Sequence, residues 1–308
     1  SVKSSANTEK IREATKIPLG QVILYSVLNR WSWYRMKSFA LHSGIVLAAV
    51  GLLGCATPQF VYDILPAVYE YKVELVPGVT VGEDPAYTAN EDGSITFDKE
   101  GLRVTVSYLR DDELNEFYSD VSFQERFSAN PFTYGNWRDP DLGYTPSRFT
   151  VFEVEVFNPV LPKVELFPDQ VQLLTDRGED LPYYGINREE SEYSFEDYYT
   201  LIRGPGGNEQ YRFDQRMSIV REELYREEHQ VFKGGDYSGY ISFSALAEGV
   251  ANVELRVKGF ALQFDEANHP TVTVDLVFAF DMKVEKRELK GEEARLARQR
   301  NWVLRQAQ

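Results

Sequence analysis

Side chains that act as nucleophiles or bind transition metals are scarce in this chain of 308 residues. Cys55 is the only cysteine, and two of the three histidines, His229 and His269, lie forty residues apart in the carboxyl-terminal half. A zinc site would therefore need carboxylates for most of its ligands, which is unusual, and no Gly-x-Ser-x-Gly turn indicates a serine hydrolase. We interpret both histidines as polar residues beside turns, and we predict no catalytic residue, metal ion or cofactor.

A pair of carboxylates is a further candidate for a catalytic site, because two acids about 5–9 Å apart across a cleft can catalyse hydrolysis of a glycosidic bond. The chain has 48 Asp and Glu residues, so neighbouring pairs are expected by chance. We interpret Asp111-Asp112-Glu113 as a solvated turn. Asp139 and Asp141, followed by Gly143, resemble part of a calcium loop, but the third acidic position and the distal glutamate are missing. We predict a plain turn there.

Aromatic residues suggest a second kind of site. Tyr134, Trp137 and Tyr144 lie close together in a stretch rich in Asp, Asn, Pro and Gly. Exposed rings on a loop can stack on a sugar or anchor a protein partner. With Asp139 and Asp141 these residues form a candidate ligand loop. The alternative is that the rings pin the loop to its own domain.

The charge of the chain restricts its partners. The formal net charge is −15, and because residues 1–54 carry seven Lys or Arg and two Glu, the part from Cys55 onward carries about −20. Such a polyanion is repelled by phosphates, so we predict no nucleic-acid partner. Apolar residues make up 43% of the chain, enough for a buried core in one large domain or two small ones.

The amino-terminal segment has a three-part pattern. Arg35 and Lys37 precede an apolar run at 39–53, which is shorter than the about 20 residues that a membrane span needs. The run ends in Leu52-Leu53-Gly54-Cys55, which resembles the lipobox of bacterial lipoproteins. The resemblance implies that Cys55 carries a lipid and that the chain is cut before it. It also implies a membrane partner reached through the lipid anchor.

This resemblance divides the chain at its amino-terminal end. We expect 36–54 to be the signal peptide and 55–69 a tether, with Ala56 after the cysteine favouring the outer membrane of the cell envelope. We interpret 1–35 as an extension produced by start-site assignment, with Met36 as the true start. The alternative is a real cytoplasmic extension.

Strand patterns dominate the rest of the chain and predict an all-β fold over residues 70–286. The segment 149–157 is the clearest strand, although apolar residues occur on both of its registers, which suggests a bulge near Phe152 and Glu153. In the segment 272–280 every second residue, from Val272 to Phe280, is a large apolar one, which predicts one apolar strand face. We predict a long loop at 111–147.

Two segments are predicted to be helical rather than extended. One is an insertion at about 187–229, in which Gly204-Pro205-Gly206-Gly207 links two helices, and the other is a helix at 287–308.

Turn residues separate the strands at the spacing of a β-sandwich. The segment from Phe232 to Phe243, with Gly234-Gly235 inside it, resembles the entry to a late strand in immunoglobulin-like β-sandwich lipoproteins of bacterial envelopes. From these observations we expect a non-enzymatic envelope lipoprotein that binds or scaffolds another envelope protein. The alternatives are a glycan-binding module that uses the Trp137 loop and an acid-catalysed hydrolase.

Overall fold

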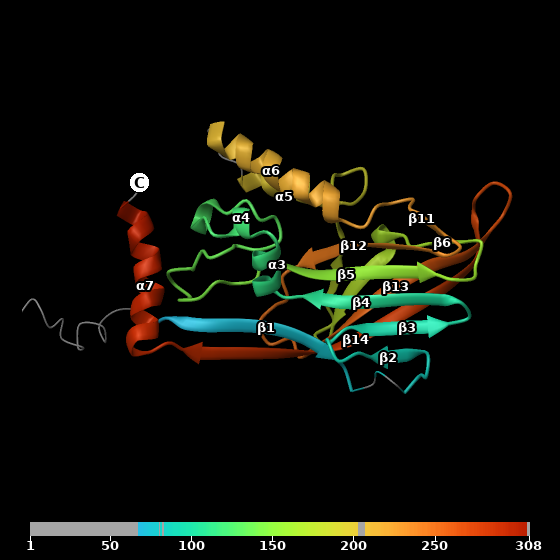
Figure 1. Ribbon diagram of the computed structural model, residues 1–308, viewed down its shortest axis with the longest axis horizontal. Helices are drawn as coiled ribbons and strands as arrows, with labels where there is room; N and C mark the ends of the chain where they lie inside the picture. The colour runs from blue at the N-terminus through green and yellow to red at the C-terminus, as the bar shows by residue number, and fades with distance from the viewer. Residues whose placement is uncertain (1–66, 80, 82, 203–206, 307–308) are drawn as a thin grey trace, which may run out of the picture. The chain divides into compact units, whose positions relative to one another are not determined.

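The computed structural model describes residues 67–79, 81, 83–202 and 207–306, and Figure 1 shows their arrangement. Within these residues, most strands pair antiparallel in two sheets. The larger sheet runs β1 (Tyr69–Pro77), β14 (Pro270–Glu288), β13 (Asn252–Phe264), β6 (Lys163–Glu165) and β11 (Gln230–Phe232), with β7 (Val171–Thr175) paired to β13 and to β8 (Asp180–Pro182). The smaller sheet runs β12 (Gly235–Ser244), β5 (Phe149–Asn158), β4 (Leu102–Leu109), β3 (Ile95–Lys99) and β2 (Tyr87–Ala89). The predicted all-β class is confirmed.

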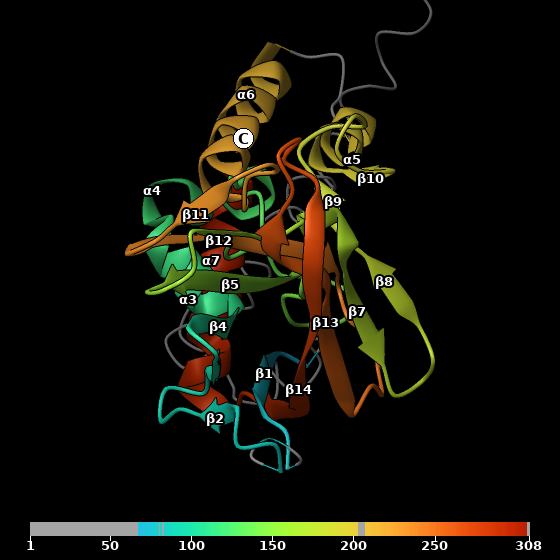
Figure 2. The same cartoon turned by 90° about the vertical axis from the view of Figure 1, so that its right-hand side faces the viewer.

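The inner faces of these two sheets share one core, and Figure 2 shows the sheets as separate layers. Leu276, Phe278 and Phe280 of β14 are fully buried on one side of it, and Val104 and Val106 of β4 on the other. Each such side chain contributes about 1.5–3 kcal/mol when it leaves water. The predicted alternation in β14 is confirmed for these three residues, which anchor the strand in the core.

The strand β5 is buried on both faces over its first half. Phe152 and Val154 point into the core between the sheets, whereas Phe149 and Val151 pack in a second apolar cluster beneath helices. The pairing of β5 with β4 and β12 continues without a register shift. The predicted bulge near Phe152 and Glu153 is therefore wrong. Apolar residues occupy both registers because the helices cover the second face.

Two helices, α5 (Phe195–Ile202) and α6 (Gly207–Glu223), cover the outer face of the smaller sheet near β5 and β12 (Figure 1). They lie inside the segment predicted to be a helical insertion. Met217, Val220 and Leu224 follow one another at intervals of three and four residues, and all three are buried in the second cluster. The tip between the helices at 203–206 lies outside the described residues, so the predicted glycine linker is not observed.

The segment 111–147 contains helical structure that the sequence did not predict. It forms α3 (Asp111–Phe117), α4 (Ser119–Ser122) and the 3-10 helix η1 (Glu125–Phe127), followed by a buried stretch around Phe132. The prediction of one long loop is therefore wrong for its first half.

The remaining small elements are η2 (Pro168–Gln170), a parallel pair formed by β9 (Tyr184–Gly185) and β10 (Tyr193–Ser194), and α7 (Gly291–Gln306) at the predicted carboxyl-terminal helix. Among the helices of the described ranges, none has both the length and the apolar character needed to span a bilayer.

Candidate ligand-binding groove

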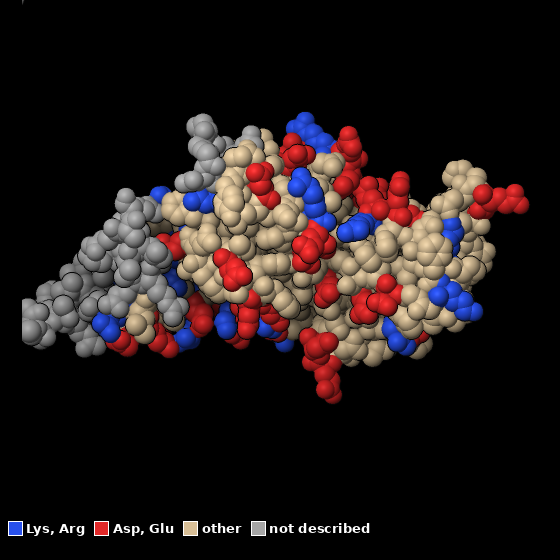
Figure 3. All heavy atoms as spheres, turned by 45° about the horizontal axis from the view of Figure 1, so that its top comes forward, with Lys and Arg blue, Asp and Glu red and all other residues tan. Residues whose placement is uncertain are grey.

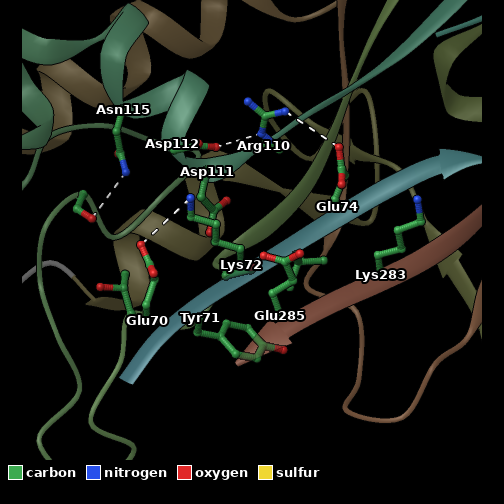
Figure 4. A pocket seen from close by; sticks show the side chains of 14 residues that line it. Glu70, Tyr71, Lys72, Glu74, Arg110, Asp111, Asp112, Asn115, Lys283 and Glu285 are labelled. Atoms are coloured by element: carbon green, nitrogen blue, oxygen red, sulfur yellow. Dashed lines mark hydrogen bonds and ion pairs between the residues drawn. The ribbon is translucent and has the colours of Figure 1, made fainter. Parts of the chain in front are cut away.

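A groove of about 460 Å³ runs along β1, between this strand and the first turn of α3 (Figure 4). It is lined from four parts of the chain that are distant in sequence: β1, β14, the start of α3, and the segment 135–147. The lining residues are Glu70, Tyr71, Lys72, Val73, Glu74, Arg110, Asp111, Asp112, Asn115, Gly135, Thr145, Ser147, Lys283 and Glu285.

The hydrogen bonds of β1 show which way its main chain faces. Consecutive residues of a strand direct their N–H and C=O groups to alternate sides. The N–H of Gly78 donates to the carbonyl of Ala279 beside β14 at 2.9 Å, so even-numbered residues face β14. The N–H of Tyr69 instead donates to the carbonyl of Gly143 at 2.9 Å. Odd-numbered residues of β1 therefore face away from β14.

This alternation leaves an open edge along the groove. Tyr71 and Val73 lie between the two closed positions, line the groove, and direct their main-chain groups outward. Among the residues that the structure describes, no protein group accepts from their N–H groups or donates to their carbonyls. An unpaired strand edge of this kind is a template for hydrogen bonding to another chain.

The two ends of the groove are closed by different contacts. At one end the main chains of Tyr69 and Gly143 are hydrogen-bonded. At the other end the guanidinium of Arg110 lies 3.9 Å from the carboxylate of Glu74, and Figure 4 shows this pair crossing the groove. Both side chains are more than one-third exposed, so the ion pair contributes about 0–1 kcal/mol.

The acidic segment Asp111-Asp112-Glu113 forms the first turn of α3, so its interpretation as a solvated turn is wrong. Carboxylates at this position interact favourably with the positive end of the helix dipole. The carboxylate of Glu113 accepts from the N–H of Arg110 at 3.0 Å, and that of Asp112 accepts from the Arg110 guanidinium at 3.0 Å. These contacts fix the end of the helix beside β1. A run of acids before Leu114 is the signal that could have predicted this start.

Asp111 is the unusual carboxyl of the groove. Desolvation raises its pKa to about 7, and the nearby charge of Asp112 acts in the same direction. A hydrogen bond with Ser147 and the charge of Arg148 partly oppose this shift. The residue as a whole is partly exposed at the rim of the groove, and desolvation of its carboxyl group is the largest cause of the shift. The groove therefore contains an acid that changes charge near neutral pH.

Carboxylates exceed cations among the groove residues. Five of the lining side chains are acidic (Glu70, Glu74, Asp111, Asp112 and Glu285) and three are basic (Lys72, Arg110 and Lys283). Even-numbered residues of β1 stand opposite residues of the opposite charge on β14: Lys72 is opposite Glu285, and Glu74 is opposite Lys283. The excess negative charge lies with α3.

A smaller cavity of about 180 Å³ adjoins the groove on the other face of β1. Tyr71 and Val73 line both spaces. The walls of the smaller cavity are mainly aromatic and apolar, and they include Tyr108, Leu246 and Met282. The two faces of the β1 edge therefore differ, because one is charged and the other is apolar.

Buried polar contacts hold the wall opposite β1. The fully buried amide of Asn130 donates to the carbonyl of Leu114 in α3 at 3.1 Å and to the hydroxyl of Ser122 at 2.9 Å. Its oxygen accepts from the N–H of Phe132 at 2.9 Å. A buried loop needs such partners, because an unpaired polar group in the interior costs about 1–3 kcal/mol. Asn130 thus ties the loop to α3.

Two arginines, one in α6 and one immediately before β5, support the same loop. Arg216 of α6 donates to the carbonyl of Ser128 at 2.6 Å, and Arg148 donates to the hydroxyl of Tyr199 at 3.0 Å. The Tyr199 hydroxyl in turn donates to the carbonyl of Pro131 at 2.5 Å. Cations and hydroxyls here satisfy main-chain carbonyls that water cannot reach. The helical insertion thus positions the groove wall.

The predicted ligand loop lies next to the groove, but its aromatic rings contact the protein itself. Tyr144 stacks on Tyr71 of β1 with ring centroids 4.3 Å apart. Tyr134 packs against Trp137 at 5.4 Å with the rings inclined by 52°, and the guanidinium of Arg148 lies 4.0 Å from the Tyr134 ring centre. None of the three aromatic residues is fully exposed. These rings pin the loop to the domain.

The remaining predicted residues lie in turns or outside the described part of the chain. The carboxylate of Asp139 accepts from the N–H of Asp141 at 2.8 Å, which closes the expected turn. His269 is exposed in a turn and lies 3.4 Å from Asp265, whereas His229 stacks on Tyr237 at 3.7 Å. Within the described ranges, no three His, Cys, Asp or Glu residues are grouped so that they could hold a metal ion.

The lipid-attachment residue Cys55 and the lipobox residues Leu52, Leu53 and Gly54 precede the described ranges. No family model, curated protein or solved structure matches this chain.

Proposed function

We propose that this protein is a lipid-anchored lipoprotein of the bacterial cell envelope, and that it binds another envelope protein through the groove along β1. The anchor rests on the lipobox-like residues 52–55, on the basic flank and on the short apolar run before them. The signal would place the protein in the outer membrane. The two-sheet core is proposed to be immunoglobulin-like.

The observation that carries the binding function is the open edge of β1 beside an acidic groove. Main-chain groups of Tyr71 and Val73 have no protein partner in the described residues, and they face a space large enough for several side chains. The surface beyond the groove is also acidic. Figure 3 shows carboxylates spread over the face in view, with fewer basic residues between them. This charge supports a cationic rather than an anionic partner.

Purification of the acylated protein from native membranes tests the proposal. Asp112→Lys reverses a charge inside the groove, whereas Asp120→Lys makes the same change in the first turn of α4, away from the groove lining. We expect one stoichiometric partner with the unaltered protein and with Asp120→Lys, and its loss with Asp112→Lys. Equal recovery with both variants would place the partner elsewhere, and recovery of no partner would contradict the function.

One observation favours a second candidate, hydrolysis with acid catalysis. Asp111 has a pKa of about 7 and shares the groove with the carboxylates of Glu70 and Glu74, and catalytic acids are tuned in this way. Hydrolysis of envelope glycans that disappears in Asp111→Asn, while the fold is retained, would establish this function instead. The glycan-binding alternative has less support, because Tyr134 and Trp137 are inclined to each other rather than coplanar.

A further inference from the structure

We propose that the groove binds an extended peptide segment as an additional strand on β1, and that this segment alternates basic and apolar residues. This inference rests on the proposed function and specifies the chemistry of the partner. It is carried by the open main-chain edge, by the two closed ends of the groove and by the different character of its two faces.

The main chain of β1 has a regular row of outward-facing groups. Tyr71 and Val73 each direct one N–H and one C=O away from β14. Residues two apart in a strand are separated by about 6.8 Å, and a paired strand lies about 4.8 Å away. A second extended chain matches this repeat, whereas a compact small molecule does not. Strand addition to an exposed sheet edge is a recurring mode of peptide binding.

The closed ends limit the length of the added strand. Tyr69 is already bonded to Gly143, and Arg110 crosses to Glu74. The interval available for pairing is therefore residues 70–74, or about 17 Å of extended chain. A segment of four or five residues fills it, and its ends leave the groove toward solvent.

The residues on the two faces of β1 determine which side chains the bound segment needs. Side chains alternate between the two faces of a strand, and paired strands share this alternation. On one face, the segment meets Asp111 and Asp112 of α3, which give the groove lining its excess of carboxylates over Lys72, Arg110 and Lys283. This excess favours Lys or Arg in the segment. On the other face it meets the cavity lined by Leu246 and Met282, which favours Val, Ile or Leu.

The structure disfavours pairing of β1 with a second copy of this chain. The edge carries Glu70, Lys72 and Glu74, so a copy would add two carboxylates and one lysine, a net negative charge, to a groove that already has an excess of carboxylates. Like charges opposite each other destabilise paired strands. Self-association through β1 is therefore an outcome that would contradict the proposal.

Synthetic hexapeptides test the proposal with the full chain in non-ionic detergent. The probe is acetyl-(Lys-Val)3-amide, and its controls are acetyl-(Glu-Val)3-amide and two forms of the probe that are N-methylated on all Lys or on all Val residues. Fluorescence anisotropy of the same peptides with a fluorophore in place of the acetyl group gives affinity, and hydrogen–deuterium exchange with the acetylated peptides identifies the protected segment. We expect the Lys peptide to bind at least about tenfold more tightly than the Glu peptide, and to slow exchange in residues 70–74. One methylated form should lose binding because it removes the N–H groups that face β1.

A matched pair of variants separates strand addition from charge attraction alone. Val73→Pro removes one outward N–H without removing a ladder bond to β14, because the N–H of Val73 faces away from β14. Proline is tolerated at such an edge position. Val73→Thr keeps this N–H. We expect affinity to fall about tenfold in Val73→Pro and less than about threefold in Val73→Thr.

Equal binding of both variants, equal binding of the Lys and Glu peptides, or protection outside β1 would overturn the proposal. Concentration-dependent dimers protected at β1 would overturn it as well. If such a result occurred while Asp112→Lys still abolished recovery of a membrane partner, strand addition would fail and the proposed function would stand.

Discussion

Replacing Asp111 by Asn should stabilise the protein at neutral and alkaline pH. Asp111 is held in the groove wall, where desolvation raises its pKa from 3.8 to about 7. Between these values the folded protein retains a proton that the unfolded chain releases. The free energy of unfolding therefore decreases as pH rises from about 4 to about 7 and is constant above that range. Asparagine remains neutral and has no such dependence.

The size of the effect follows from the shift. One pKa unit corresponds to about 1.4 kcal/mol, so the full shift would give about 4 kcal/mol as an upper limit. Asp111 is partly exposed at the rim of the groove, and its charge is screened by water there. We therefore expect Asp111→Asn to be more stable than the unaltered protein by about 1–2 kcal/mol at pH 8, with the advantage absent at pH 4.

Urea unfolding at one-unit steps from pH 4 to pH 8 measures this difference. Asp92→Asn is a control of opposite sign, because the Asp92 carboxylate accepts from the N–H and hydroxyl of Ser94, which lowers its pKa. The stabilisation from Asp92 is present at neutral pH and is lost on acidification, so Asp92→Asn should be the less stable protein at pH 8. A loss of stability in Asp111→Asn that is equal at every pH would show that desolvation does not raise the pKa of this carboxyl.

Three further predictions concern the groove wall and the anchor. Asn130→Ala leaves buried main-chain groups unpaired and should reduce the free energy of unfolding by about 2–3 kcal/mol; a loss below about 0.5 kcal/mol in urea unfolding would contradict the contacts assigned to this amide. Gly135→Ala should cost about 2–5 kcal/mol, because its φ is +62° and a Cβ would lie 1.9 Å from the carbonyl oxygen of Ser122. Gly178→Ala, with φ +81° and open space around it, should cost only about 1–2 kcal/mol, and equal losses of thermal stability would count against this packing. Cys55→Ser should abolish labelling with radioactive palmitate and move the protein from the membrane fraction to the soluble fraction; an unlabelled parent protein would exclude the lipid anchor.

Local patterns predicted those elements whose burial follows a simple period. The alternation at 276–280 and the helical spacing of Met217, Val220 and Leu224 both correspond to single buried faces. The strand β5 does not follow a simple period, because helices from a distant segment cover its outer face and bury residues on both registers. The helix α3 was missed because a run of three acids is also typical of a turn, and the hydrogen bond from the N–H of Arg110 to Glu113 is visible only in the structure.

The groove could not be predicted from the sequence, although several of its residues attracted attention. Asp111 and Asp112 are about forty residues from Tyr71, and nothing local indicates that α3 lies beside β1. The open edge depends on sheet order and register, which place β1 outermost with its odd residues facing away from β14. Tyr144 was recognised as an aromatic of interest, but its partner Tyr71 was not. Such juxtapositions arise only from tertiary structure.

Photocrosslinking in living cells tests most directly whether the groove is the binding surface of a membrane-anchored protein. A photoreactive phenylalanine analogue replaces Lys72, an exposed groove residue, or Glu266, an exposed residue in the turn before β14. We expect the analogue at position 72 to give one crosslinked envelope protein in the membrane fraction, Asp112→Lys to abolish this product, and the analogue at position 266 not to give it. The same product from both positions, or none from position 72, would show that the groove is not the binding surface.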